Sequence, residues 1–273
     1  MDFTFLYDKT RGLFSIGYNV EENSLGNSYY DLLASESRIA SFVAIAKNDV
    51  PSSHWFKLGR SMTNAFHTHS LVSWSGTMFE YFMPSLIMRN YPKTLLSQTY
   101  KSVIKAQKSF AKQKKSPWGI SESAFYEFDA AENYQYKAFG VPGLGLKRGL
   151  EDDLVISPYS TLMAISFDKD SGIKNLKELE KLGALGRYGF IEALDYTKAR
   201  KDKYIMTLSK SDLLEQNIST NGKNYTQNVD KYEDYVDNYE KIVDNTQDKN
   251  TSYMNNKHVD NVNNVCLLYT SLS

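Results

Sequence analysis

Cysteine, long apolar runs and net charge are all scarce in this chain of 273 residues. Cys266 is the one cysteine, so no disulfide framework can form within the chain. This excludes the disulfide-stapled class of small secreted proteins and fits a reducing compartment. No stretch approaches the roughly 20 continuous apolar residues of a membrane-spanning helix. Residues 1–20 also lack the basic start and apolar run of a signal peptide. We therefore expect no membrane span in this chain.

The charge balance gives no general attraction for polyanions. The 32 basic residues equal the 32 acidic residues in number, so the formal net charge is zero. Binding to nucleic acid or to an anionic membrane rests on a positive field, which this composition does not supply. We expect no nucleic-acid partner.

Aromatic residues are abundant, at 14% of the chain with 20 tyrosines. Such an excess suits a large core and equally suits a surface that stacks on carbohydrate. Composition also divides the chain into two regions. Residues 1–200 are rich in aliphatic and aromatic side chains, whereas residues 201–273 become Asn- and Asp-rich. The second region has too little apolar surface to offset its ordering entropy, so we predict a divergent, disordered tail after residue 200.

Local patterns predict mostly helices in the first region. Residues 3–20 read as two short strands around a Lys-Thr-Arg-Gly turn, and β-like pieces surround residues 54–60 and 70–74. Apolar side chains recur at helical spacing elsewhere. The predicted helices are 30–47, 77–90 with an interruption at Pro84, 93–113, 157–167 and 172–182. This order favours an array of paired helices over a parallel α/β sheet.

Two carboxylates stand out against this background. If residues 30–47 form a helix, Glu36 falls inside the apolar stripe that Leu32 and Val43 define, where a carboxylate is costly unless it is paired or faces a cavity. The alternative is a Glu at the stripe edge that reaches solvent. Glu122 lies in "WGISESAF" (118–125), a turn leading into a possible helix start. It is either a first-turn Glu favoured by the helix dipole or, given its apolar neighbours, a general acid with a raised pKa.

Further carboxylates lie among aromatic residues. Glu80 is in "SWSGTMFEYFMP", and Glu192 and Asp195 are in "RYGFIEALDY", two segments that each read as a Gly-containing turn running into a helix. Segments that combine a carboxylate with aromatic residues are typical of the lining of a sugar cleft. His67 and His69 have no nearby acidic or cysteine ligand, so we expect neither a metal site nor a cofactor.

Six blocks of residues 1–200 closely resemble the glucoamylase-like central domain of bacterial cyclic β-1,2-glucan synthases. The blocks occur in the order of that family and are "LFSIGYNVEENSLGNSYYDLLASESRIASFVAIAKNDVP", "HWFKLGR", "SWSGTMFEYFMPSLIMRNYPKTLLSQT", "PWGISESAF", "YQYKAFGVPGLGLKRGL" and "LGALGRYGFIEALDYT". The resemblance ends after the last block. The "SYMAHHQGM" block expected next is absent, with a trace at Ser252, Tyr253 and Met254.

The resemblance implies a fold and a setting. The implied fold is mainly α, an incomplete (α/α)6-barrel of the glucoamylase type with a short N-terminal β-hairpin. The implied setting is a larger bacterial enzyme in which a membrane-embedded glycosyltransferase builds the glucan and a phosphorylase-like domain trims it. Such an enzyme lies at the inner membrane, with this segment on its cytoplasmic face.

The resemblance also implies an activity and residue roles. The central domain closes linear β-1,2-glucan into a ring by transglycosylation with retention, for which a pair of carboxylates is needed. The matching positions favour Glu122 as the general acid/base and Glu36 as the opposite carboxylate, acting as nucleophile or as base through a sugar hydroxyl. The implied sugar-binding residues are Trp118, Tyr136, Glu80, Glu192 and Asp195. Two alternatives remain open: an inverting endo-β-1,2-glucanase, and an inactive glucan-binding fragment.

Overall fold

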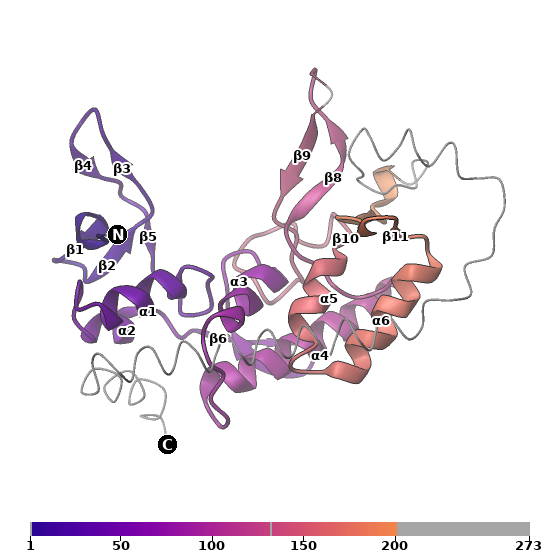
Figure 1. Cartoon of the computed structure of the whole chain (residues 1–273), viewed down its shortest axis with the longest axis horizontal. Coiled ribbons are helices and arrows are strands. Elements are labelled where there is room, and N and C mark those ends of the chain that lie inside the picture. The colour runs from indigo at the N-terminus through magenta and orange to yellow at the C-terminus, as the bar shows by residue number, and fades with distance from the viewer. Residues whose placement is uncertain (1, 132, 201–273) are drawn as a thin grey trace.

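Residues 2–131 and 133–200 are described by a computed structural model, and within them short antiparallel hairpins surround one long helix (Figure 1). The predictions for residues 201–273, and therefore for the tail, lie outside the described residues. The helices are α1 (Arg38–Ala46), α2 (Ser53–Lys57), α3 (Met78–Phe82), α4 (Leu95–Lys114), α5 (Pro158–Ala164) and α6 (Lys169–Lys181), with 3-10 turns η1 (Thr4–Leu6), η2 (Met83–Leu86) and η3 (Lys198–Arg200).

The strands are short and pair in antiparallel fashion. One three-stranded sheet has the order β1 (Tyr7–Asp8), β2 (Leu13–Ser15), β5 (Tyr29–Tyr30). The two-stranded pairs are β3 (Tyr18–Asn19) with β4 (Ser24–Leu25), β6 (Met62–Ala65) with β7 (Thr68–Leu71), β8 (Ser123–Phe128) with β9 (Tyr134–Lys137), β10 (Val155–Ile156) with β13 (Leu194–Asp195), and β11 (Leu185–Gly186) with β12 (Gly189–Phe190). The predicted N-terminal hairpin is confirmed, with Tyr7 opposite Phe14. Strands recur well beyond it, however, so a helical array with strands only at the start was too simple.

Helix α4 organises the core. Thr94 caps its first turn by accepting a hydrogen bond from the Ser97 backbone N–H at 3.2 Å, and Lys115 ends it in the left-handed conformation. The predicted apolar stripe is confirmed. Its members Leu96, Tyr100, Val103, Gln107 and Phe110 are all buried.

The polar member of this stripe has a defined task. The Gln107 side chain donates to the Ile120 carbonyl and accepts from the Ile120 N–H, both at 2.9 Å. Both groups of the amide are thereby satisfied, as burial requires. The pair fixes the segment leading to Glu122 against α4, so the core of the molecule positions the start of β8.

Several predicted helices form, with shifted boundaries. The 77–90 pattern divides into α3 and the 3-10 turn η2, with Pro84 in the latter. The last two helices appear as α5 and α6, and α6 stops just before Gly183, which has a φ of +83°. The 30–47 helix begins late, at Arg38, because Tyr29 and Tyr30 pair with β2 and Leu32 forms a bridge with Gly59.

Three local predictions were wrong. The β-like piece at 54–57 is part of helix α2. The possible helix after Glu122 is the strand β8, and the segment around Asp195 is the strand β13. In the last two cases a partner strand decides the conformation: Ala124 faces Tyr136 across the β8–β9 hairpin, and Asp195 faces Val155 from a more distant segment. Tertiary pairing outweighs a local helical pattern in such segments.

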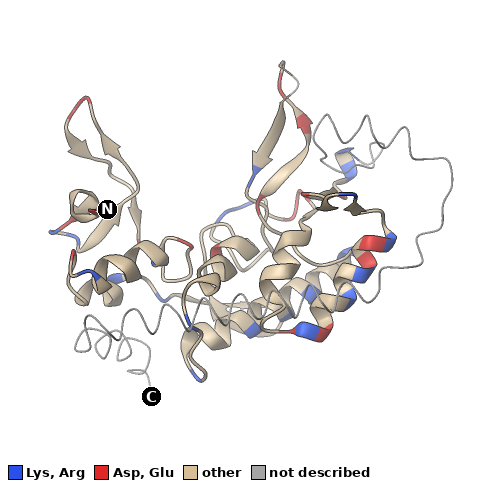
Figure 2. Cartoon of the chain, viewed as in Figure 1, with Lys and Arg blue, Asp and Glu red and all other residues tan. Residues whose placement is uncertain are grey.

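The β3–β4 and β8–β9 hairpins project on the same side of the molecule, with α3 in the region between their bases (Figure 1). Charged residues gather instead along α6, while the ribbons of α3 and α5 contain almost none (Figure 2). Helix α5 holds no charged residue, and Glu80 is the one charged residue of α3. A carboxylate in this region therefore lies in apolar surroundings.

Candidate active site

Three of the predicted carboxylates lie in one electrostatic neighbourhood. Burial is the main cause of the raised pKa of Glu80 and of Glu122, and the charge of Glu36 raises both further. The three side chains come from separate segments: the turn before α1, the first turn of α3, and the residue just before β8. Glu36 therefore lies within electrostatic range of Glu122, from which it is 86 positions away in the chain (122 minus 36).

The local structure of Glu36 differs from the predicted one. It precedes α1, so the stripe argument that placed it inside a helix was wrong. It lies in a turn, half-buried, where its carbonyl accepts the Ile39 N–H at 3.2 Å. The Ser35 hydroxyl donates to its carboxylate at 3.2 Å. Glu36 is therefore held by turn geometry, and its carboxylate retains acceptor capacity for a ligand.

The sequence analysis missed Arg38, a fully buried cation beside this turn. Its guanidinium donates to the carbonyls of Ser35 at 2.9 Å, Glu80 at 3.2 Å and Tyr81 at 2.6 Å, and to the Tyr100 hydroxyl at 2.9 Å. A buried charge is tolerated only when it is well hydrogen-bonded. Arg38 thus joins the turn of Glu36 to α3 and α4. An arginine at the start of an otherwise apolar helix was the signal for it.

Glu122 is held from both of its ends. The Tyr136 hydroxyl donates to its carboxylate at 3.2 Å, and the Tyr159 hydroxyl donates to its backbone carbonyl at 2.7 Å. The Tyr159 hydroxyl also donates to the Ser121 hydroxyl at 2.8 Å. The Ser121 hydroxyl in addition accepts the Phe79 N–H of α3 at 2.9 Å. The Ser121 hydroxyl therefore satisfies a backbone donor in the first turn of α3.

The electrostatics of Glu122 favour its protonated form. Burial raises its pKa most, the hydrogen bond from Tyr136 lowers it, and the charge of Glu36 raises it, with a net upward shift. Burial and the neighbouring Glu122 in turn raise the pKa of Tyr136 to about 12, and burial raises that of Tyr159. Both phenols therefore stay protonated near neutral pH and act as donors. This is the environment expected of a general acid.

Glu80 has a structural task at the same place. Its carboxylate accepts the Ser75 N–H at 2.9 and 3.1 Å and the Thr77 N–H at 3.3 Å, while Thr77 accepts the Glu80 N–H at 3.0 Å. This is a complete capping box at the start of α3. Because backbone donors occupy the buried carboxylate, the geometry does not support Glu80 as a direct ligand of a sugar.

Trp118 is buried, with 7% of its surface exposed, and packs in the core. Its backbone exchanges hydrogen bonds with the Asn175 side chain at 3.1 and 2.8 Å. A ring in this position presents little face to a ligand, so we do not retain Trp118 as a sugar-stacking residue. Trp74, which lies next to the capping box of Glu80, is 43% exposed. It was present in a quoted motif but was not selected.

Glu192 and Asp195 support the β8–β9 hairpin from the side. Glu192 accepts the Ala124 N–H at 2.7 Å, and Asp195 accepts the Tyr126 N–H at 3.3 Å. Asp195 is buried and pairs with Arg200 at 2.6 Å. Glu192 is exposed, and its charge raises the pKa of Tyr136. Of these two predicted binding residues, Glu192 is the one whose carboxylate stays accessible.

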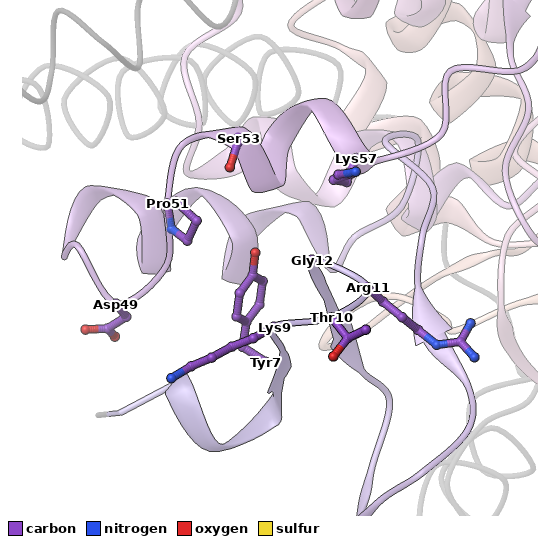
Figure 3. Close-up of a pocket in the computed structure, with 9 residues that line it drawn as sticks. All are labelled: Tyr7, Lys9, Thr10, Arg11, Gly12, Asp49, Pro51, Ser53 and Lys57. Carbon is purple, nitrogen blue, oxygen red and sulfur yellow. The ribbon is translucent and has the colours of Figure 1, made fainter.

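A pocket of about 430 Å³ lies elsewhere, between the β1–β2 turn and α2 (Figure 3). It is lined by Tyr7, Lys9, Thr10, Arg11, Gly12, Asp49, Pro51, Ser53 and Lys57. Figure 3 shows Lys9 and Arg11 extending in different directions, so the cations of this pocket do not converge on one point. In residues 2–131 and 133–200 no group of three or more His, Cys, Asp or Glu side chains is arranged to hold a metal ion.

Comparison with known proteins places the chain in a family. Residues 28–212 match the family model Glycoamylase, described as "Putative glucoamylase". The chain belongs to the Glycoamylase family. This Glycoamylase chain is also 48% identical over 200 residues to the cyclic beta-(1,2)-glucan synthase NdvB of Rhizobium meliloti (strain 1021). The resemblance to cyclic β-1,2-glucan synthases is thereby confirmed. The alignment covers 73% of this chain, which spans 7% of the length of that relative.

Two solved structures share the fold of this Glycoamylase chain. A "putative glucoamylase" from Bacteroides fragilis NCTC 9343 aligns with a TM-score of 0.56 and 18% identity, over 72% of this chain and 50% of that one. The endo-beta-1,2-glucanase of Talaromyces funiculosus, in complex with sophorose, aligns with a TM-score of 0.57 and 14% identity, over 92% and 55% of the two chains. At these identities the likeness shows the fold alone. The predicted glucoamylase-type fold is therefore confirmed as a fold type. A closed barrel is not seen in the described residues.

None of the helices within residues 2–131 and 133–200 combines the length and the apolar character needed to cross a membrane.

Proposed function

We propose that this Glycoamylase chain acts on linear β-1,2-glucan and closes it into a ring by retaining transglycosylation. The observation that supports the proposal is that Glu36 and Glu122, two carboxylates from distant segments, lie close enough for the charge of Glu36 to raise the pKa of the partly buried Glu122. The 48% identity to a cyclic beta-(1,2)-glucan synthase supports the substrate class. Membership of the Glycoamylase family supports an action on carbohydrate. Ring closure is the more specific part of the proposal.

The first step breaks the glycosidic bond. Glu36, half-buried and still able to accept, attacks the anomeric carbon as nucleophile, or acts as base through a sugar hydroxyl. Glu122, whose pKa is raised by burial and by Glu36, gives its proton to the leaving oxygen. In the nucleophilic route this leaves a glycosyl–Glu36 ester and an ionised Glu122. The hydrogen bond from Tyr136 stabilises the carboxylate that has just formed.

The second step closes the ring. Glu122 takes the proton of the 2-hydroxyl at the other end of the same chain, and that oxygen attacks the anomeric carbon and displaces Glu36. Two inversions give overall retention, and both carboxyl groups return to their starting states. In this proposal Glu192 and Tyr136 orient glucosyl units near Glu122, and the mechanism needs no cofactor. Asp195 contributes through the hairpin that it supports.

The proposal extends to the setting of the chain. As part of a larger bacterial enzyme, it would receive linear glucan from a glycosyltransferase domain and work beside a phosphorylase-like domain. Its place would be the cytoplasmic face of the inner membrane. The 7% share of the synthase that the chain spans leaves room for such domains in that relative.

An inverting endo-β-1,2-glucanase is the second candidate. The shared fold with a fungal endo-beta-1,2-glucanase favours it. Water would then replace the 2-hydroxyl of the acceptor, and the two carboxylates would stand farther apart, roughly 6.5–9.5 Å instead of about 5–5.5 Å. A glucan-binding chain without catalysis is the third candidate.

Product analysis on linear β-1,2-glucan separates these candidates. Cyclic products support transglycosylation, shorter linear chains support the glucanase, and binding without products supports the non-catalytic alternative. We expect Glu122→Gln to abolish turnover while the circular dichroism spectrum stays unchanged. Glu127→Gln, a change of the same chemistry on the exposed part of β8, should keep wild-type activity. Unchanged activity of Glu122→Gln would remove the assignment of Glu122.

A further inference from the structure

Trp74 differs from the other two tryptophans of the chain in its exposure. It is 43% exposed, whereas Trp55 and Trp118 are 2% and 7% exposed. All three tryptophans of the sequence are among the described residues. Single exposed apolar side chains are common on protein surfaces, so exposure alone assigns no role to Trp74. Its backbone and its neighbours do.

The backbone around Trp74 is fixed on both sides. The Ser73 N–H donates to the Leu144 carbonyl and the Leu146 N–H to the Ser73 carbonyl, both at 3.0 Å, and the Lys147 N–H donates to the Trp74 carbonyl at 2.9 Å. On the other side the Ser75 N–H is bound by the Glu80 carboxylate. A loop held at each residue, with its one large ring left outside, is preorganised to present that ring.

Close packing reinforces this arrangement. A Cβ on Gly145 would lie 2.5 Å from the Ser75 carbonyl carbon and 2.6 Å from the Gly76 nitrogen. Gly76 itself has a φ of +70°, which glycine adopts at no steric cost. The segment 73–76 and the segment 140–147 therefore meet backbone to backbone, and the Trp74 loop has little freedom to move.

The position of Trp74 links it to the carboxylates. Its chain neighbour Ser75 binds Glu80, and the charge of Glu36 acts on both Glu80 and Glu122. An exposed aromatic ring on a rigid loop suits a sugar, whose C–H face packs on the ring while its hydroxyls reach polar groups. A tryptophan also loses little conformational entropy on binding because it has two side-chain torsions.

We propose that Trp74 is the aromatic platform on which a glucosyl unit of the substrate stacks, in the role that the sequence assigned to Trp118. This inference rests on the proposed function for the identity of the sugar. It adds a binding residue that orients the glucan relative to Glu36 and Glu122.

Intrinsic fluorescence tests the inference without any need for turnover. In the Glu122→Gln background, which removes catalysis, tryptophan emission is quenched by acrylamide with and without linear β-1,2-glucan. Because Trp55 and Trp118 are buried, the quenchable emission comes from Trp74. We expect the glucan to protect it. Linear α-1,4-glucan of the same length serves as the control sugar and should give no protection.

Two variants complete the experiment. We expect Trp74→Leu to raise the dissociation constant for linear β-1,2-glucan about tenfold, measured by calorimetry, with an unchanged circular dichroism spectrum. Phe56→Leu removes another exposed aromatic ring, on α2, and should leave the affinity unchanged. Glucan binding that neither protects Trp74 nor weakens in Trp74→Leu would overturn the inference and leave the proposed function standing. A chain that neither binds nor converts β-1,2-glucan would overturn both.

Discussion

At the scale of single residues, burial raises the pKa of Glu122 most, and two neighbours then act on this pKa in opposite directions. The phenol of Tyr136 donates to the carboxylate and lowers the pKa, and the charge of Glu36 raises it. Within the described residues, Tyr136 is the one side chain that donates to this carboxylate. The protonation state of the proposed general acid can therefore be moved in either direction by a single substitution.

Replacing Tyr136 by Phe should raise the pKa of Glu122. Loss of the donor removes the stabilisation of the charged form, so the pKa of Glu122 rises further. A general acid must be protonated, so the alkaline limb of the pH profile of kcat/KM should move to higher pH. Tyr188→Phe, at an exposed tyrosine in the β11–β12 turn, is the control and should keep the wild-type profile. An alkaline limb that stays in place in Tyr136→Phe would contradict this assignment.

Replacing Glu36 by Gln should lower the pKa of Glu122. The neutral amide no longer repels the ionised form, so the pKa of Glu122 and that of Glu80 should both fall. Carbon-13 NMR titration of the carboxyl groups measures this without catalysis. Glu21→Gln, an exposed residue of the β3–β4 turn, is the control for a nonspecific change of charge. A Glu122 titration that Glu36→Gln leaves unmoved would separate the two carboxylates and remove the proposed pair.

At the scale of elements, the loop that presents Trp74 and Glu80 depends on a glycine contact. Gly145→Ala would place a methyl group within 2.6 Å of backbone atoms of Ser75 and Gly76. We expect a loss of about 1–3 kcal/mol in the free energy of unfolding, by analogy with overpacked cores. Urea denaturation measures it. Gly17→Ala meets nothing within 4 Å and should change stability by less than about 0.5 kcal/mol. Equal stabilities for the two variants would show that the loop adjusts.

Elements could be predicted from the sequence where the signal is local. The stripe of α4, the stop of α6 at Gly183 and the turn between β1 and β2 are all set by residues within a few positions of one another. The segments after Glu122 and around Glu192 were predicted to be glycine-containing turns that run into helices. Their strands exist because Tyr136 and Val155 supply partners from elsewhere in the chain, and no local pattern contains that information.

The residues of the candidate site could likewise be predicted from the sequence only in part. Chemistry and kinship pointed to Glu36 and Glu122, and in the fold the charge of Glu36 acts on Glu122. Burial was beyond the reach of the sequence: Trp118 and Trp74 carry the same side chain, yet one packs in the core and the other is exposed. The cause is Gln107 and Asn175, which fasten residues 118–120 to α4 and α6 through hydrogen bonds that span the fold.

At the scale of the whole molecule, a charged network ties the β8–β9 hairpin to the rest of the structure. Asp153 pairs with Lys137 of β9 and, at 2.8 Å, with Arg200, which also binds the buried Asp195 of β13 at 2.6 Å. Burial pushes the pKa of Asp153 up, but the hydrogen bonds from Lys137 and Arg200 push it down further, and the net pKa is lowered. The network thus couples global stability to pH.

The lowered pKa of Asp153 predicts an acid-sensitive stabilisation. The contribution is complete above the unfolded-state pKa of about 3.9 and is lost as pH falls through the lower folded-state value. The difference in unfolding free energy between wild type and Asp153→Asn should therefore be largest above about pH 5 and shrink below about pH 4. Urea denaturation across this range measures it. Asp152→Asn, at the exposed neighbouring position, should show no such trend, and a flat difference for Asp153→Asn would remove the network from the pH response.

The guanidinium of Arg38 also frees part of the chain to vary. It fastens the carbonyl of Ser35 to those of Glu80 and Tyr81 across more than 40 positions of sequence. The position of Glu36 relative to α3 therefore does not depend on the length of the polypeptide that joins them. Residues inserted at the exposed Asn48, between α1 and α2, would enlarge the perimeter of the molecule while the two acidic segments keep their mutual register.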